Sequence, residues 1–225
     1  MSRAASPQKL PFAVSQTSED RLFFERSLSR QGYRRIAGLD EVGRGPLAGP
    51  VVAACVILPV AEDYLVFNDS KKISPARREK LHDLLMEQGI PFGIGVVDRE
   101  DIDRLNILQA SLLAMKKAVL QLSIQPDFLL IDGNQPINMS IPQRSLVKGD
   151  SRSASIAAAS IIAKVTRDRM MEEYHQQFPA YRFDRHKGYP TREHREAIKH
   201  HGPCRLHRLS FRGVREFRRM KPDQD

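Results

Sequence analysis

Two adjacent carboxylates, Asp40 and Glu41, follow a short apolar run and precede a Gly-Arg-Gly turn. Acids in an apolar setting are costly unless a cation or a protein partner offsets their charge. Gly43 and Gly45 let the backbone approach a ligand closely, and Arg44 between them suits an anion. The stretch therefore predicts a metal site beside a phosphate or sugar site. The alternative is an exposed acidic pair that opens an ordinary turn.

Two further acids, Asp132 and Asp150, share the context of the first pair. Asp132 follows the apolar run 128–131 and precedes a glycine, and Asp150 follows a glycine after the short run 145–147. Ligands of open α/β sheets bind beyond the carboxyl ends of the strands, so we expect all four acids in one crevice. Because Asp-Gly and Gly-Asp are common turn pairs, either acid alone is more simply a turn cap.

Taken together in a basic chain, the four acids favour a divalent-metal site, because such carboxylates cannot all stay ionised without cations. Oxygen ligands with no supporting histidine or cysteine favour Mg²⁺ or Mn²⁺ over zinc. A pair of such ions about 3.5–4 Å apart drives in-line hydrolysis of phosphodiesters. The sequence therefore predicts a two-ion site of this kind.

The apolar patterning predicts an α/β protein. We expect strands over residues 36–39, 51–58, 92–97, 128–131 and 145–147. We expect helices over residues 18–30, 75–88, 98–105, 106–122, 151–178 and 191–200, and another over 211–219. Early strands joined by short turns and later ones separated by helices imply a mixed sheet with helices on its faces.

The composition, 41% hydrophobic and 28% charged over 225 residues, is that of a soluble globular protein with enough apolar material for a core. No apolar run approaches the roughly 20 residues of a membrane span, and we expect no secretory signal. The two cysteines, Cys55 and Cys204, fit a reducing cytoplasm without a disulfide framework. We therefore expect a cytoplasmic protein that makes no contact with membranes.

The formal net charge of +9 is concentrated near the C-terminus. Residues 181–220 hold 12 lysines and arginines against 4 acids, a net charge of +8, together with five of the seven histidines. A basic end on a nearly neutral body predicts a polyanionic partner, most simply nucleic acid. A solubilising or disordered tail is the alternative, although aromatic residues and an ordered-looking motif in this region argue against it.

Several motifs together resemble those of ribonuclease HII, the type 2 ribonuclease H. They occupy residues 40–51, 68–71, 131–133, 148–151, 156–160, 164–168, 186–191 and 207–211, in the order of that family. The resemblance implies a ribonuclease H-like fold, a mixed central sheet flanked by helices with a small helical C-terminal appendage. We accordingly divide the chain into an N-terminal arm over 1–17, a catalytic domain over 18–185 and a basic helical region over 186–225.

The resemblance also implies roles for single residues. The positions matching Asp40, Glu41, Asp132 and Asp150 bind the two metal ions and carry catalysis. The stretch matching Gly43, Arg44 and Gly45 reads the 2′-hydroxyl of a ribonucleotide through backbone contacts, which glycine permits. The position matching Tyr189 stacks on the sugar of the adjoining deoxynucleotide. By itself, Tyr189 would be a half-buried tyrosine in a turn.

Four more residues resemble contacts of the family with backbone phosphates: Lys71, Asn106, Lys164 and Arg167. Asn106 equally suits the N-cap of the helix that it begins, and Lys164 equally suits a solvated helix position. Asp168 lies on the same helix as Lys164. It supports the metal ligands without contacting the ions itself, or it pairs with Arg167 or a neighbouring base.

Two further observations bear on the family and on the metal. Type 3 relatives have an extra N-terminal domain and a lysine in the glycine turn, whereas this chain has a short arm and Arg44, which favours type 2. His200, His201, Cys204 and His207 have a spacing that suits zinc. The family pattern has no such site and the surrounding arginines repel cations, so zinc is the weaker interpretation.

The predicted activity is hydrolysis of the phosphodiester on the 5′ side of a ribonucleotide, leaving a 3′-hydroxyl and a 5′-phosphate. The expected partners are RNA–DNA hybrids and duplex DNA carrying single ribonucleotides, bound by a monomer. A contact with a replication clamp stays open. The alternatives are another two-metal nuclease of the same fold, such as a resolvase-like enzyme, and a catalytically silent nucleic-acid-binding module.

Overall fold

The structure, a computed structural model, describes residues 20–61, 64, 66–67 and 73–219. Its centre is a five-stranded sheet in the order β3-β2-β1-β4-β5. The strands are β1 (Ile36–Val42), β2 (Val51–Ile57), β3 (Phe92–Val97), β4 (Phe128–Asp132) and β5 (Gln143–Leu146). The pairs β1–β2 and β2–β3 are antiparallel, whereas β1–β4 and β4–β5 are parallel. The predicted mixed sheet is confirmed.

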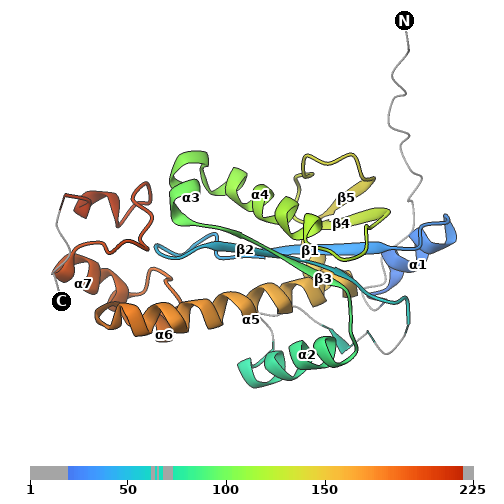
Figure 1. Ribbon diagram of the computed structural model, residues 1–225, viewed down its shortest axis with the longest axis horizontal. Helices are drawn as coiled ribbons and strands as arrows, with labels where there is room; N and C mark the ends of the chain where they lie inside the picture. Colours follow the sequence, from blue (N-terminus) through green and yellow to red (C-terminus); the bar gives the residue numbers. More distant parts are fainter. Residues whose placement is uncertain (1–19, 62–63, 65, 68–72, 220–225) are drawn as a thin grey trace, which may run out of the picture.

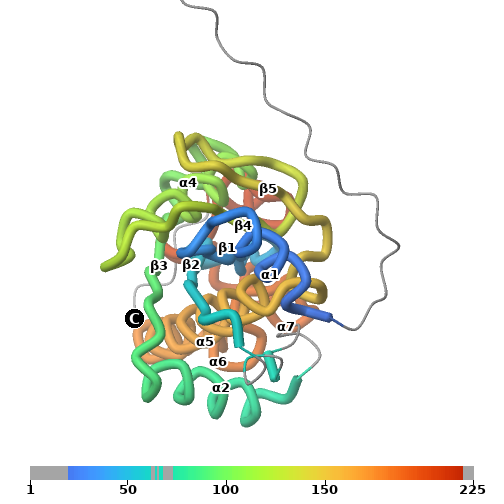
Figure 2. The backbone as a smooth tube through the Cα atoms, turned by 90° about the vertical axis from the view of Figure 1, so that its right-hand side faces the viewer, coloured from blue at the N-terminus to red at the C-terminus, as the bar shows by residue number. Residues whose placement is uncertain are grey.

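Helices cover both faces of this sheet (Figure 1). They are α1 (Phe23–Arg30), α2 (Pro75–Glu87), α3 (Arg99–Leu105), α4 (Ile107–Leu120), α5 (Ala154–Gln177), α6 (Phe183–His186) and α7 (Arg192–His201). Figure 2, a view from the right-hand side of Figure 1, places α4 on one side of the strands and α5 with α2 on the other. The predicted helices on the two faces are therefore confirmed.

The alternation of side chains along β2 divides the core between the two faces. Ala54 and Val56 pack with the small residues of α5, while Ala53 and Cys55 pack with α4. Successive side chains of a strand point to opposite faces, so one strand can serve both layers. All four side chains are fully buried. Both layers therefore hold the same central strands in place.

The long helix α5 crosses close to β1 at Gly38. A Cβ atom at Gly38 would collide with backbone atoms of Ser155 and Ile156 in the first turn of α5. Ser153 caps this turn by accepting a hydrogen bond from the Ile156 amide at 3.2 Å. The start of α5 is thereby fixed against the strand that carries two of the predicted acids.

Several of the predicted element boundaries need correction. Strand β1 continues to Val42, because its ladder with β2 extends to the pair Val42–Val52, so the first two acids lie inside the strand and not after it. Over 211–219, where a helix was expected, the chain forms turns and one short 3₁₀ segment, Arg215–Phe217. The helix expected to begin near residue 18 begins at Phe23, and the predicted arm over 1–17 lies outside the described residues.

The basic C-terminal segment packs on the rest of the chain through two small apolar clusters. Ala48 contacts the first, which includes Phe183 and Cys204, and Leu47 contacts the second, which includes Ile198 and Val214. These contacts attach α6, α7 and the following turns to the loop between β1 and β2. Across the described residues, no helix combines the length and the apolar character needed to cross a membrane.

Candidate active site

The sheet brings the carboxylates to neighbouring positions. Asp40 and Glu41 lie near the end of β1, and Asp132 is the last residue of β4. The parallel register of these strands pairs Leu39 with Ile131, so Asp40 and Asp132 occupy the next row. Asp150 follows β5 in a 3₁₀ turn, Gly149–Ser151. The acids thus gather where three neighbouring strands end.

The charges of these acids act on one another. Burial raises the pKa of Asp40 well above its usual range, and repulsion from Glu41, Asp132 and Asp150 raises it further. Burial also raises the pKa of Glu41, although Arg44 opposes this shift through an ion pair at 3.1 Å. A buried carboxylate that faces three others favours a bound cation, because a cation removes both the desolvation cost and the repulsion.

Hydrogen bonds orient two of the carboxylates. The Asp40 Oδ1 atom accepts from the Glu41 amide at 2.7 Å, and the Asp132 Oδ1 atom accepts from the Gly149 amide at 2.6 Å. Asp132 keeps a second oxygen for another ligand, and the Asp40 side chain also accepts a hydrogen bond from Ser160. The four acids provide oxygen donors alone, and such a set suits Mg²⁺ or Mn²⁺. The donor chemistry therefore fits the predicted ions.

A second group of possible metal ligands lies on α2. Within the described part of the chain, Glu79, His82 and Asp83 on α2 are the one set of three or more side chains whose ligand atoms all lie within 4.8 Å of one another. Glu79 is engaged in an ion pair with Arg169 at 2.6 Å, and Asp83 is exposed. This set lies on a helix surface and lacks the burial that distinguishes Asp40.

The Gly-Arg-Gly turn follows β1 directly and depends on glycine at its first position. Gly43 has φ +98°, a left-handed value that favours glycine. A Cβ atom there would collide with the Arg167 side chain and lie 2.8 Å from the Pro50 carbonyl oxygen. The turn therefore lies against Arg167 and the start of β2 with no room for a side chain.

Two fully buried arginines hold the carbonyl groups of this loop. Arg208 donates to the carbonyl oxygens of Gly43 at 2.6 Å, Arg44 at 3.2 Å and Gly49 at 2.8 Å. Arg167 donates to Ala48 at 3.1 Å and to Pro50 at 2.9 Å, and it also reaches the Lys187 carbonyl at 2.9 Å. Together, the two guanidinium groups satisfy five carbonyls of the loop over residues 43–50.

The place of Arg167 differs from the expectation of a phosphate contact. Its side chain is 0% exposed, and burial lowers its pKa to about 10. Arg208 is equally buried, and burial lowers its pKa to about 9. Arg208 escaped the sequence reasoning as a site residue, because arginine in a basic region is expected at the surface. Its occurrence in the motif over 207–211 was the one available signal.

Tyr189 lies beside the turn. A Cβ atom built at Gly45 would stand 3.6 Å from the Tyr189 Cε1 atom, which is ordinary contact distance. The Tyr189 side chain is 39% exposed, so its ring is available to a ligand while one edge faces the glycine. The structure therefore brings the predicted ribose-reading turn and the predicted stacking residue together.

The remaining predicted phosphate contacts are placed unevenly. Lys71 lies outside the described residues. Exposed Asn106 caps α4, its Oδ1 atom accepting from the Leu108 amide at 3.0 Å and the Gln109 amide at 3.1 Å. Asn106 is therefore the N-cap of α4, the alternative to a phosphate contact. Its side-chain amide nitrogen remains a possible donor to a phosphate. Lys164 forms an ion pair with Asp168 at 2.6 Å.

Asp168 also pairs with Arg78 of α2, whose guanidinium lies 3.6 Å away. Burial lowers the pKa of Lys164, and the hydrogen bond that Lys164 donates to Asp168 opposes this shift. Asp168 thus pairs with Lys164 on its own helix and links α5 to α2 through Arg78, which matches the expected pairing with a neighbouring base. Arg78 was not anticipated, since nothing in the spacing of α2 distinguishes it from other basic helix residues.

The histidines and the cysteine suggested for zinc do not assemble. The rings of His200 and His201 stack on each other at 4.6 Å on α7, whereas buried His207 contacts Cys204 and His194. The His207 Nε2 atom lies 3.1 Å from the His194 Nε2 atom, a hydrogen-bond distance. Helix α7 directs His194, and not His200, toward the interior, where His194 meets His207.

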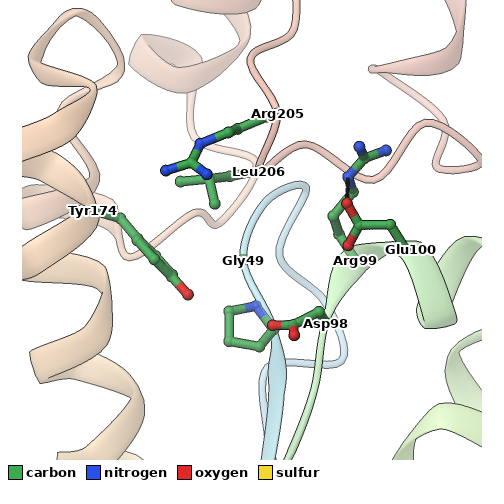
Figure 3. Close-up of a pocket in the computed structure, with 8 residues that line it drawn as sticks. Gly49, Asp98, Arg99, Glu100, Tyr174, Arg205 and Leu206 are labelled. Carbon is green, nitrogen blue, oxygen red and sulfur yellow. Dashed lines mark ion pairs between the residues drawn. The ribbon is translucent and has the colours of Figure 1, made fainter.

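A pocket of about 260 Å³ lies behind the loop between β1 and β2 (Figure 3). Gly49 and Pro50 form one wall, Tyr174 of α5 faces them, and Arg205 with Leu206 close a third side. The four carboxylates are not among its lining residues. The pocket therefore lies apart from the carboxylates, between the loop, α5 and the C-terminal segment.

Comparison with known proteins adds an independent observation. A family model described as Ribonuclease HII matches residues 37–214. The chain is 57% identical over 196 residues to a ribonuclease HII of Syntrophotalea carbinolica, covering 87% of this chain and 94% of the relative. It is 56% identical over 193 residues to a ribonuclease HII of Geobacter sulfurreducens, covering 86% of this chain and 89% of the relative.

Solved structures give the same picture. The ribonuclease H2 of Pyrococcus horikoshii OT3 matches with a TM-score of 0.68 at 26% identity, over 82% of this chain and 97% of that one. The RNase HII of Archaeoglobus fulgidus, solved in a complex with PCNA, matches with a TM-score of 0.62 at 28% identity, over 73% and 85%. At 20% identity, the Bst-RNase HIII in complex with Mn²⁺ shares the fold with a TM-score of 0.62, over 81% and 68%.

The acidic set predicts metal-dependent stability. We expect Mn²⁺ or Mg²⁺ at millimolar concentration to raise the melting temperature of the protein, because a ligand that binds the folded state stabilises it. Asp132→Asn should reduce this rise, and Asp83→Asn on α2 should preserve it. Thermal unfolding followed by circular dichroism, with and without each ion, measures the effect. A rise lost in Asp83→Asn and kept in Asp132→Asn would place the ion on α2.

The buried histidines predict a pH dependence of stability. Burial lowers the pKa of His194 to about 4 and that of His207 to about 3, and the neighbouring His194 and His186 rings lower the pKa of His207 further. His186 and Arg195 also face His194 with positive or potentially positive charge. The unfolded chain binds these protons with pKa values near about 6.5, so protonation favours unfolding.

The free energy of unfolding should therefore be fully maintained above about pH 6.5 and should fall as the pH decreases toward 4 and 3. Each imidazole contributes at most about 1.4 kcal/mol per pH unit in this window. Urea unfolding between pH 4 and 7.5 measures the slope, which His194→Gln should flatten. The control His200→Gln alters an exposed residue of the same helix, and an equal flattening there would refute the assignment to the buried pair.

Proposed function

The chain belongs to the ribonuclease HII family and is a ribonuclease H endonuclease, and from this premise we propose where and how it cuts. The proposed reaction is hydrolysis of the phosphodiester on the 5′ side of a ribonucleotide, leaving a 3′-hydroxyl and a 5′-phosphate. The proposed substrates are RNA–DNA hybrids and single ribonucleotides embedded in duplex DNA. Two bound divalent ions would supply the positive charge and the activation of water that this hydrolysis requires.

The proposed metal ligands are Asp40, Glu41, Asp132 and Asp150. Asp40 is buried at the centre of the set, and its pKa is raised first by burial and then by repulsion from the other acids, both of which a cation would offset. The Gly149 amide directs one oxygen of Asp132, which limits the directions that its other oxygen can face. The role of the chain at this point is to hold oxygen donors before the substrate arrives.

The observation that carries the proposal is the proximity of the Tyr189 ring to the glycine turn, where a Cβ atom built at Gly45 would stand 3.6 Å from the ring. The Glu41–Arg44 ion pair joins the carboxylates to the turn, and the position of Gly45 against the Tyr189 ring joins the turn to the tyrosine. A nucleotide whose 2′-hydroxyl faces the turn would therefore place its neighbouring sugar against the ring. This pair of contacts, the 2′-hydroxyl with the turn and the next sugar with the ring, suits a junction between a ribonucleotide and a deoxynucleotide.

The loop carbonyls support readout by the backbone. Arg208 draws the carbonyls of Gly43, Arg44 and Gly49 toward the interior, so the opposite surface of the loop can present other backbone groups to a ligand. A hydrogen bond to a 2′-hydroxyl distinguishes RNA from DNA, because DNA lacks that group. We propose Arg167 and Arg208 as supports of this loop, and we keep Asn106 and Lys164 as proposed contacts with phosphates.

The C-terminal region supplies sequence-independent affinity in this proposal. Its exposed bases are Arg192, Arg195, Lys199, Arg205, Arg212, Arg215, Arg218 and Arg219. Contacts with phosphates release counterions, so the affinity for a duplex should fall steeply with salt. The solved Archaeoglobus fulgidus RNase HII is bound to PCNA. For this chain, a clamp contact and a monomeric state stay predictions.

One cleavage assay tests the reaction. The protein is incubated with Mg²⁺ or Mn²⁺ and a DNA duplex that carries one ribonucleotide, beside an all-DNA duplex of the same sequence. We expect one cut on the 5′ side of the ribonucleotide, with ends that a polymerase extends from the 3′-hydroxyl, and an intact control. Equal cutting of both duplexes would favour a different two-metal nuclease, and cutting of neither would favour a binding module.

A further inference from the structure

One short segment, residues 204–208, contacts both elements that the proposed function assigns to sugar recognition. It runs antiparallel to the returning limb of the loop between β1 and β2, forming a β-bridge between Ala48 and His207. The Gly49 amide donates to the Leu206 carbonyl at 2.9 Å, and the Arg208 amide donates to the Leu47 carbonyl at 2.8 Å. Figure 3 shows Leu206 beside Gly49 at this junction.

His207 and Arg208 serve the two elements separately. The hydrogen bonds of their two side chains lead to different partners. Arg208 reaches the Gly43 and Arg44 carbonyls at 2.6 and 3.2 Å. His207 reaches His194, which contacts Tyr189. One peptide unit therefore connects the glycine turn with the tyrosine.

The hydrogen bonds made by the His207 and His194 rings form a chain in which the direction of donation is fixed. The Cys204 amide donates to the His207 Nδ1 atom at 3.0 Å, so His207 carries its proton on Nε2. That proton is donated to the His194 Nε2 atom, 3.1 Å away. His194 then carries its proton on Nδ1 and donates it to the Tyr189 carbonyl at 2.9 Å. Both rings are neutral in this arrangement, and the relay ends on the backbone of Tyr189.

His186 holds the loop that contains Tyr189 through a second set of hydrogen bonds. The Gly188 amide donates to the His186 Nδ1 atom at 3.2 Å, so the His186 Nε2 atom donates to the Tyr181 carbonyl at 2.8 Å. The His186 and His194 rings stack with their centroids 4.4 Å apart. The Gly188 carbonyl in turn accepts from the Leu47 amide at 2.8 Å. The loop of Tyr189 is thus bonded to the relay and to the limb that leads from the glycine turn.

We infer that residues 204–208 act as a brace that sets the spacing between the Gly43–Gly45 turn and the Tyr189 ring. His207, through His194, and Arg208 are its positioning residues. The inference rests on the proposed function, because it assigns the two braced elements to the sugars of one ribonucleotide–deoxynucleotide junction. We call the contact of His207 with His194 the histidine arm of the brace and the contacts of Arg208 with the loop carbonyls the arginine arm. The inference adds the prediction that the two arms affect the cleavage of different substrates.

The two arms should be separable by kinetics. Tyr189 faces a deoxynucleotide sugar only at a junction, so weakening the histidine arm should lower cleavage at a single ribonucleotide more than cleavage of a hybrid with a continuous RNA strand. Weakening the arginine arm should lower cleavage of both substrates, because both present a 2′-hydroxyl to the turn. A brace with only a structural role would lower both activities in proportion to the loss of folded protein.

The experiment compares kcat/KM on the two substrates for His194→Gln, His207→Gln, Arg208→Lys and Tyr189→Ala. We expect the histidine variants and Tyr189→Ala to lower the ratio of single-ribonucleotide to hybrid activity about tenfold or more, since small misplacements of binding groups have effects up to about a hundredfold. Arg208→Lys keeps the charge but lacks the planar fork, so it should lower both activities with the ratio nearly unchanged.

Tyr181→Phe is the matched control, because it removes a buried hydrogen bond to the Gly202 carbonyl, 2.8 Å in length, within the same cluster. It should leave the substrate ratio at the wild-type value. A lowered ratio in Tyr189→Ala with a wild-type ratio in folded His194→Gln would overturn the brace and leave the proposed function intact. A wild-type ratio in Tyr189→Ala would instead overturn the proposed stacking role. If His207→Gln fails to fold, His194→Gln decides the outcome.

Discussion

The burial of two guanidinium groups beneath one loop is the constraint on which the candidate site depends. A buried guanidinium keeps its charge only if hydrogen bonds replace the water that it has lost. Arg167 and Arg208 obtain those bonds from backbone carbonyls of the loop over residues 43–50. The loop cannot change shape without leaving charged donors unsatisfied, so its conformation is set by the interior and not by the ligand.

The same constraint connects the loop to the rest of the fold. Arg167 projects from α5, whose first turn is held against β1 at Gly38. Buried Glu25 of α1 accepts from the Ser153 hydroxyl at 2.6 Å and the Ser155 amide at 3.1 Å at the start of that helix. Burial raises the pKa of Glu25, and the hydrogen bonds oppose the shift. A carboxyl group at a helix N-terminus is also favoured by the helix dipole. The position of α5 thus links the acids, the loop and α1.

The sequence allowed the fold class and the convergence of the acids to be predicted, because both follow from the order of apolar runs and from the polarity of strand ends. It did not reveal that Asp40 and Glu41 lie within β1, since the partner strand decides how far a ladder extends. Arg167 illustrates a second limit. A basic residue on a helix is equally consistent with a surface contact and with a buried network, and the choice depends on the loop that packs above it.

The histidines illustrate a third limit. Spacing along the chain suggested His200 and His201 as partners of His207, but the rotation of α7 about its axis directs His194 inward. Such pairings depend on tertiary contacts between the helix and a segment that follows it. Features that arise within one element, such as the cap of α4 by Asn106, were predictable. Side-chain contacts between distant segments, such as that of His194 with His207, were not predictable from spacing along the chain.

The central claim is that the backbone of the Gly43–Gly45 turn recognises a single 2′-hydroxyl. The most direct measurement is the dissociation constant of the Asp132→Asn protein, in the presence of Mn²⁺, for two duplexes that differ by that one oxygen. We expect tighter binding of the duplex with one ribonucleotide than of the all-DNA duplex, by about 0.5–1.5 kcal/mol, the net contribution of one hydrogen bond. Equal dissociation constants for the two duplexes would contradict it.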